Sequence, residues 1–296
     1  MKKEDFKIDY LGIGTHRAAT SWIQQCLIEH PQICGEKELH FLTNPQKCNQ
    51  GIGLYASFFS RCQPNQIKGE FTPGYLSEDI DHSFIKRYFP NVKFIVCLRN
   101  PIERAYSHFL FHKSSEKTSA KTLEEAIEKE PMLKFYYINT GFYYSQLKKY
   151  FELYPKENFL ILIYEDISKN PLKFIQGIFK FLGVNPNFVP PSVNQQINYS
   201  PKNALRIPFL NFYITKLKRF VFSHPKFFGL FVFLARCCRV NKLIEFIRQA
   251  NVRKSGLERY EKPPLLEKTR KNLRETYQEE IKNLEKLINR DLSFWK

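Results

Sequence analysis

Gly12-Ile13-Gly14-Thr15-His16-Arg17-Ala18-Ala19-Thr20-Ser21 is the stretch around which the chain is organised. It joins a predicted strand to a predicted helix through a short turn. The run 8–11 before it is typical of a buried strand. In 21–28 the apolar residues recur at helical spacing, and Pro31 ends that helix. The first amides of a helix have no acceptor within the helix, and the helix dipole is positive there. The stretch therefore predicts an anion-binding turn.

Side chains of this turn add to its expected affinity for anions. Thr20 and Ser21 supply hydroxyl donors, and Arg17 supplies a permanent charge with two donors that fit phosphate-type oxygens. An ordinary strand-to-helix turn with Thr20 as its N-cap stays open as the alternative. The pattern G-x-x-x-x-G-K-[ST] is absent, so the turn differs from a standard nucleoside triphosphatase loop.

Length and composition limit the classes to which the protein can belong. The chain has 296 residues, of which 43% are hydrophobic and 16% aromatic, enough for a large α/β domain with a real core. Its net charge of +17 favours an acidic partner such as a nucleotide, an acidic glycan, an anionic membrane or nucleic acid. No spanning helix and no secretion signal are predicted.

The cysteines indicate a reducing environment. Their number, seven, is odd and no C-x-x-C pair occurs, which predicts neither a disulfide framework nor a zinc site. We therefore expect reduced thiols in a cytoplasmic protein. The adjacent Cys237 and Cys238 are interpreted as core residues rather than a redox centre.

A second candidate anion contact follows the strongly apolar run 92–98, which predicts a strand covered on both faces. Arg99 leaves this strand, and Pro101 suits the first position of a helix. Arg99 and Ser107 would converge on one phosphate at the edge where open α/β sheets bind ligands. A structural salt bridge of Arg99 is the alternative.

The rest of the chain continues the alternation of strands and helices. Segment 159–163 predicts a third strand, and a helix from Pro171 is closed by Gly183. This order predicts an α/β fold with a parallel, doubly wound sheet. Segments 34–41 and 69–76 are interpreted as loops. Glu38 and His40 in the first are candidate general bases, and a solvated turn is the alternative.

The composition changes after residue 200. Residues 201–250 hold ten Lys or Arg and one acid, with Phe-rich patches between them. This region is either a surface for a membrane or an acceptor, or a subdomain that packs its aromatic residues inward, which we favour. Segment 265–287 predicts an amphipathic helix, and we expect Trp295 to dock on the core.

Several segments, in order, resemble the sulfotransferases that use 3′-phosphoadenosine 5′-phosphosulfate (PAPS), in particular the bacterial and Golgi carbohydrate, heparan-type branch. Residues 14–23 are similar to the 5′-phosphosulfate loop G-x-x-K-[AS]-G-T-[ST]-x-L, and 37–42 to the segment K-E-x-H-F-F. The segment G-E-x-[ST]-P-x-Y appears at 69–75. The 3′-phosphate motif R-[DN]-P-x-x-R-A-x-S-x-[YF] is complete at 99–109.

The resemblance spans nearly the whole chain. It implies a P-loop-like α/β domain of three layers, with a central parallel sheet flanked by helices and a helical C-terminal part. It also implies one domain over 1–296, in which 202–262 form a basic, Phe-rich helical insertion and 264–296 return to the core.

The resemblance further implies transfer of a sulfuryl group from PAPS to an acceptor hydroxyl on a carbohydrate or glycolipid, without a metal. Glu38 is the implied base with His40 behind it, and Arg17 is the catalytic cation. The implied donor site comprises two sets of residues. The 5′-phosphosulfate is held by Arg17 and the amides of Ala18, Ala19, Thr20 and Ser21, and the 3′-phosphate by Arg99 and Ser107. Trp22 is a further implied cofactor-binding residue, and Lys202 closes the site.

Two residues depart from the family pattern. Arg17 stands where Lys is usual, and because guanidinium stays protonated it cannot donate a proton to the leaving group. Ala19 replaces Gly and requires a right-handed or extended backbone unless it is strained.

Two alternative functions remain open: a P-loop nucleotide kinase-like enzyme, and a non-catalytic basic module that binds membranes or polyanions. No nucleic-acid fold motif is found, and peripheral contact with an anionic membrane is an expectation.

Overall fold

The computed structural model describes residues 6–115, 117–195 and 263–295. They fall in two compact units. The larger holds the described residues of 6–109, 123–195 and 265–295, and it carries the sheet and the candidate site. The described part of the smaller unit is 110–115, 117–122 and 263–264. The predicted insertion 202–262, which includes Lys202, Cys237 and Cys238, lies outside the described residues.

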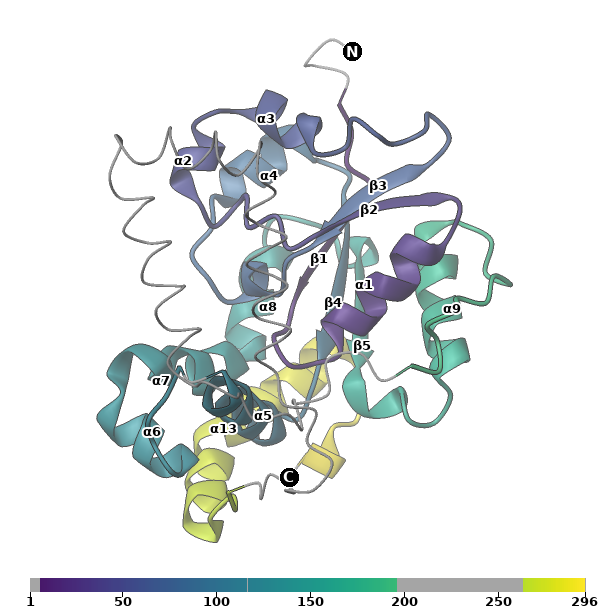
Figure 1. The fold of residues 1–296 in the computed structure, drawn as a ribbon. Helices are drawn as coiled ribbons and strands as arrows, with labels where there is room; N and C mark the ends of the chain where they lie inside the picture. The colour runs from purple at the N-terminus through teal and green to yellow at the C-terminus, as the bar shows by residue number, and fades with distance from the viewer. Residues whose placement is uncertain (1–5, 116, 196–262, 296) are drawn as a thin grey trace, which may run out of the picture. The chain divides into compact units, whose positions relative to one another are not determined.

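A five-stranded parallel sheet forms the centre of the larger unit (Figure 1), and its strand order is β2-β3-β1-β4-β5. This confirms the predicted α/β class. The three predicted strands are β1, β4 and β5. The strand bounds are β1 Tyr10–Gly14, β2 Ile33–Lys37, β3 Ile67–Phe71, β4 Lys93–Leu98 and β5 Phe159–Ile163.

The interpretation of segments 34–41 and 69–76 as loops is wrong in part, because each contributes an edge-side strand of the sheet. Both strands carry a Gly-Glu pair in place of an apolar pattern, which hid them in the sequence. Gly69 is required by packing, since a Cβ there would lie 2.3 Å from the ring of Tyr10. The polar Glu70 is tolerated at 0% exposure because four groups hydrogen-bond to its carboxylate.

Helices cover both faces of the sheet and give the three predicted layers (Figure 1). On one face lie α1 (Thr20–Glu29) and α9 (Pro171–Leu182), whose apolar side chains share a core cluster with the strands. On the other face lie α4 (His82–Tyr88) and α8 (Tyr143–Phe151). There the β4 residue Phe94 contacts Tyr150, with ring centroids 5.4 Å apart.

The C-terminal helix α13 (Glu267–Ile288) packs on α8 and buries one stripe of its surface. Trp295 is 1% exposed, as expected from the sequence, and its ring lies beside Tyr143. The remaining helices are short, apart from α5, which begins in the larger unit and ends in the smaller one. They are α2 Pro45–Cys48, α3 Ile52–Ser57, α5 Pro101–Ser114, α6 Leu123–Lys129 and α7 Pro131–Tyr137. No helix of the described part is long and apolar enough to cross a membrane.

The expectation of reduced thiols is wrong for Cys34 and Cys62, which form a disulfide with their Cα atoms 5.6 Å apart. Cys34 lies in β2, and Cys62 lies in the segment that leads into β3. Pairing of these two parallel strands brings the cysteines together, a contact that their spacing of 28 residues does not reveal. Among the described cysteines, Cys26, Cys48 and Cys97 are free.

We expect Glu70→Ala to lower the free energy of unfolding by about 3 kcal/mol, because it leaves buried hydroxyls without their acceptor. The hydroxyls of Tyr55, Thr72 and Tyr75 donate to Glu70 at 2.8, 2.7 and 2.9 Å. Urea denaturation measures the loss. Glu36→Ala is the matched control, because Glu36 pairs with Glu70 in register but makes a surface ion pair with Arg61. Its expected cost is below about 1 kcal/mol, and equal costs for both variants would contradict this role of Glu70.

Candidate active site

The candidate residues gather where the strands end. Parallel strands place their carboxyl ends at one edge of the sheet, which is the usual ligand edge of open α/β folds. Arg17 follows β1, Glu38 and His40 follow β2, and Arg99 follows β4. The register of the sheet thus brings together segments that are up to 82 residues apart, as the contact between Arg17 and Arg99 shows.

The predicted anion-binding turn is built on a strained backbone. The N-cap of α1 is Ala19 rather than Thr20, so the alternative with Thr20 as the N-cap is wrong. Ala19 has φ 57° and Arg17 has φ 68°, both left-handed, so Ala19 takes the strained conformation rather than a right-handed or extended one. Such strain costs about 1–3 kcal/mol per residue and is typical of functional sites. Of the five described non-glycine residues with positive φ, four lie in the two loops of this site.

Two guanidinium groups and a hydroxyl meet beside this turn. The Nη1 atom of Arg99 donates to the backbone oxygen of Arg17 at 2.9 Å, and the Nε atom of Arg17 donates to Ser107 Oγ at 3.3 Å. Burial and then the neighbouring charge of Arg99 lower the pKa of Arg17 to about 10, so Arg17 remains a cation at neutral pH. Two adjacent cations and a hydroxyl form a site suited to a phosphate-type anion.

Arg99 has no ion pair within the described part of the chain, which argues against the structural salt bridge. Its guanidinium lies over the ring of Tyr164, 4.4 Å from the centroid. The hydroxyl of Tyr143 donates to the Arg99 carbonyl at 2.8 Å. The position of the arginine is therefore fixed by an aromatic ring and a backbone contact, and its charge is not neutralised by a carboxylate.

Sequence reasoning missed the residues that hold the Arg99 turn. The side chain of Asn100 accepts from the amide of Ile102 at 2.9 Å and so caps α5. The same side chain donates to the carbonyl of Trp295 at 3.2 Å, and the amide of Asn100 donates to Glu165 at 3.0 Å. The motif contains Asn100, but nothing in the sequence ties it to a segment 195 residues away.

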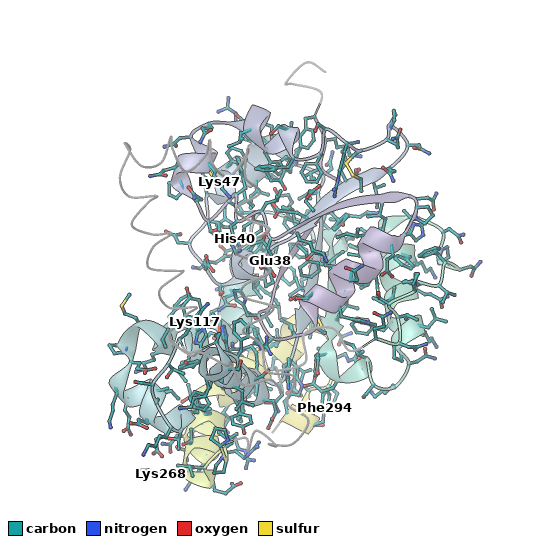
Figure 2. All side chains as sticks on the ribbon, viewed as in Figure 1. Glu38, His40, Lys47, Lys117, Lys268 and Phe294 are labelled. Atoms are coloured by element: carbon teal, nitrogen blue, oxygen red, sulfur yellow. A yellow bond between two sulfur atoms is a disulfide. The ribbon has the colours of Figure 1, made fainter. Side chains whose placement is uncertain are left out.

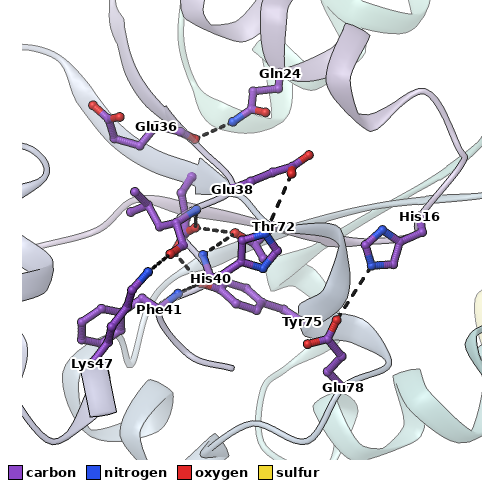
Figure 3. A network of polar contacts seen from close by, with 12 residues as sticks. His16, Gln24, Glu36, Glu38, His40, Phe41, Lys47, Thr72, Tyr75 and Glu78 are labelled. Carbon is purple, nitrogen blue, oxygen red and sulfur yellow. Dashed lines mark hydrogen bonds and ion pairs between the residues drawn. The ribbon is translucent and has the colours of Figure 1, made fainter. Parts of the chain in front are cut away.

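Glu38 and His40 lie together on the loop that follows β2 (Figures 2 and 3). His40 Nε2 is 3.9 Å from Glu38 Oε2, and both side chains are about half exposed. His40 lowers the pKa of Glu38, and Glu38 raises the pKa of His40 in return. A carboxylate held ionised and accessible in this way could accept a proton from a bound hydroxyl.

The loop that carries this pair is fastened by its backbone, unlike the solvated turn of the alternative interpretation. The amide of Glu38 donates to the carbonyl of Phe71 at 3.1 Å, and the amide of Leu39 donates to the buried Glu70 at 3.3 Å. On the other side Lys47 donates to the carbonyl of Leu39 at 2.6 Å (Figure 3). Glu38 and His40 keep left-handed backbones, with φ 43° and 47°.

The other residues predicted to bind the sulfuryl donor differ in how deeply they are buried at the start of α1. Thr20 is mostly buried and Ser21 is half-buried at the start of α1, while Ala18 is fully buried beneath the turn. The indole of Trp22 is buried and donates to the carbonyl of Ser192 at 3.1 Å, and its amide donates to Ala19. Trp22 therefore supports the turn from the core. In the described part of the chain, no three His, Cys, Asp or Glu side chains form a group that could hold a metal ion.

Comparison with known proteins defines the class. Residues 7–227 match the sulfotransferase domain family, and the chain belongs to this family. Human heparan sulfate glucosamine 3-O-sulfotransferase 5 is 27% identical over 192 residues, which cover 62% of this chain and 54% of that protein. Human carbohydrate sulfotransferase 15 is 32% identical over 143 residues, which cover 41% of this chain and 24% of that protein. The chain thus spans about half the length of the first relative and a quarter of the second.

The fold is shared with a solved sulfotransferase from Alicyclobacillus acidocaldarius. The TM-score is 0.64 at 20% identity, and the match covers 97% of this chain and 98% of that one. This likeness supports the predicted P-loop-like architecture of the family.

Proposed function

We propose that this protein transfers a sulfuryl group from PAPS to a hydroxyl of a carbohydrate acceptor. The observation that carries the proposal is the convergence of Arg17, Arg99 and Ser107 at the start of α1, on the same sheet edge as the Glu38–His40 pair. One side of this edge fits an anionic nucleotide, and the other side offers a proton acceptor. Membership of the sulfotransferase domain family supports the same conclusion.

The residues present fit the PAPS donor, which supplies the sulfuryl group and a bisphosphate leaving group when it is bound. In the proposal, Arg17 and the amides at the start of α1 hold the 5′-phosphosulfate. Arg99 and Ser107 hold the 3′-phosphate, and Lys202 is the further residue proposed to bind the donor. The absence of a charge partner for Arg99 in the described chain supports its assignment to an anionic ligand.

The proposed reaction uses Glu38 as the base. Glu38 takes the proton of the acceptor hydroxyl while the hydroxyl oxygen forms a bond to sulfur. The bond between sulfur and the bridging oxygen breaks, and its electron pair stays on the 5′-phosphate. Arg17 stabilises the charge that develops there without giving up its own proton. As in phosphoryl transfer, positioning and electrostatic stabilisation supply most of the rate enhancement.

The acceptor is proposed to be a glycan or glycolipid, because relatives that share this domain are named as heparan sulfate and carbohydrate sulfotransferases. The basic region 201–250 would contribute to its binding. We propose a cytoplasmic location with peripheral contact to an anionic membrane. A disulfide such as Cys34–Cys62 is unusual in a reducing compartment, so the redox state of these two cysteines in protein isolated from cells tests the cytoplasmic location.

Transfer of label from ³⁵S-PAPS tests the proposal. The panel comprises heparan sulfate, unsulfated N-acetylheparosan, a neutral chito-oligosaccharide and glucosylceramide in mixed micelles. We expect acid-labile label in at least one of them, without added magnesium. If none of the four acceptors is labelled, the proposed carbohydrate sulfation is wrong. Phosphoryl transfer from ATP that requires magnesium would favour the kinase-like alternative, and salt-sensitive binding of all polyanions without turnover would favour the non-catalytic module.

A further inference from the structure

A second imidazole–carboxylate pair stands beside the first and has no part in the proposed reaction. His16 comes from the turn after β1, and Glu78 follows the turn after β3. His16 Nε2 lies 3.9 Å from Glu78 Oε1 (Figure 3). That nitrogen is buried and has no hydrogen-bond partner among the described residues. The two side chains therefore lie at ion-pair distance but do not form a direct hydrogen bond.

The backbone fixes the position of Glu78. Its amide donates to the carbonyl of Gly74 at 2.8 Å. Its carboxylate lies against the same glycine, because a Cβ on Gly74 would come within 2.3 Å of Glu78 Oε1. A glycine at this position thus makes room for the carboxylate. On the other side, the ring of His16 lies against the ring of His108, with centroids 5.6 Å apart.

The two pairs are close enough to act on each other. The charge of His16 contributes to lowering the pKa of Glu38, and the charge of Glu78 contributes to raising the pKa of His40. His16 is also the largest cause of the lowered pKa of Glu78, to which His40 adds. The other charged groups that act on this cluster are Lys37, which faces Glu38, and the buried Glu70, which faces His40.

We propose that His16 and Glu78 are a positioning pair, which acts through Glu38 and His40 and keeps the proton acceptor of the site charged and oriented toward the acceptor hydroxyl. The proposal rests on the proposed function only in naming Glu38 as the proton acceptor. The electrostatic effect of one pair on the other is a property of the protein alone and is measurable without an acceptor.

Glu78→Gln tests the proposal, because it removes a charge while keeping the size of the side chain. We expect the pKa of His40, followed by NMR of the labelled imidazole in the full chain, to fall, since a nearby negative charge no longer favours the imidazolium. We expect kcat to fall while the affinity for adenosine 3′,5′-bisphosphate stays unchanged. The matched control is Asp79→Asn, which alters an exposed neighbouring carboxylate and leaves both quantities unchanged.

His16→Gln provides the second readout. It removes the imidazole whose charge contributes to lowering the pKa of Glu38, so we expect the pKa of Glu38 to rise and the acid limb of the pH profile to move upward. Glu78→Gln moves that limb in the same direction, because a less charged His40 lowers the pKa of Glu38 less. A purely structural role would leave the acid limb in place in both folded variants. An unchanged His40 titration in folded Glu78→Gln would overturn the proposal. If the wild type transfers no sulfate at all, the proposed function fails, and the His40 titration still decides whether the two pairs are coupled.

Discussion

Glu38→Gln lowers kcat for sulfuryl transfer by about 10²–10⁴-fold, the usual contribution of a general base, and leaves the affinity for adenosine 3′,5′-bisphosphate unchanged. The amide keeps the shape of the carboxylate but cannot accept the proton of the acceptor hydroxyl. The effect is large because His40 holds the pKa of Glu38 down, so the wild-type group is fully ionised at neutral pH. Initial rates with labelled PAPS and saturating acceptor measure it.

Glu36→Gln is the control for this prediction. Glu36 lies in β2, two residues before Glu38, and forms an ion pair with Arg61 at 2.8 Å. We expect its loss to leave kcat within about twofold of the wild type, as for a surface ion pair outside the site. A Glu38→Gln variant that retained the wild-type rate, together with a His40→Ala variant that lost it, would transfer the role of base to His40.

Arg17→Ala lowers kcat by about 10²–10³-fold, the cost of removing one group that stabilises charge in the transition state. The guanidinium is positioned by its hydrogen bond to Ser107 at 3.3 Å and remains protonated at a pKa of about 10. Its loss leaves the charge that develops on the leaving phosphate without its nearest cation. Single-turnover rates separate this effect from weaker donor binding.

Arg17→Lys distinguishes charge from proton donation. Lysine keeps the charge and can also release a proton, whereas the guanidinium cannot. We therefore expect Arg17→Lys to retain most of the wild-type kcat. Arg87→Ala, which removes an exposed arginine of α4, serves as the control and should leave the rate unchanged. An Arg17→Ala variant with wild-type kcat would show that this cation takes no part in the chemical step.

The elements with simple patterns could be predicted from the sequence. The strand β4 is an unbroken apolar run, and Pro101 marks the start of the helix that follows, so the position of Arg99 at the sheet edge could be derived. The helix α9 shows apolar residues at helical spacing and ends at Gly183, which has the left-handed backbone that favours glycine.

The strands β2 and β3 could not be predicted, because their stability depends on contacts made only in the folded chain. Glu70 is acceptable in a buried strand only when Tyr55, Thr72 and Tyr75 surround it. Tyr55 belongs to α3, and Thr72 and Tyr75 follow Glu70 in the turn after β3, so all three contacts form only in the folded chain. The placement of Glu38 depends on β2, so its proximity to the anion turn could be inferred from the family resemblance but not from periodicity.

Contacts between residues far apart in the sequence also could not be predicted. The contact of His16 with Glu78 and the disulfide of Cys34 with Cys62 follow from the strand order, which no local pattern determines. The strained Ala19 breaks the local rule that a left-handed position carries glycine. Exceptions to local rules are expected at functional sites, and this exception lies in the predicted anion-binding turn.

Calorimetric titration with adenosine 3′,5′-bisphosphate determines whether this edge of the sheet binds a nucleotide with a 3′-phosphate. We expect the wild type to bind it with a micromolar Kd and to bind adenosine 5′-monophosphate much more weakly. Arg99→Ala should lose most of this difference, because Arg99 carries no competing ion pair in the described chain. Absence of binding by the wild type, or equal affinity for the two nucleotides, would show that this edge of the sheet is not a 3′-phosphate nucleotide site.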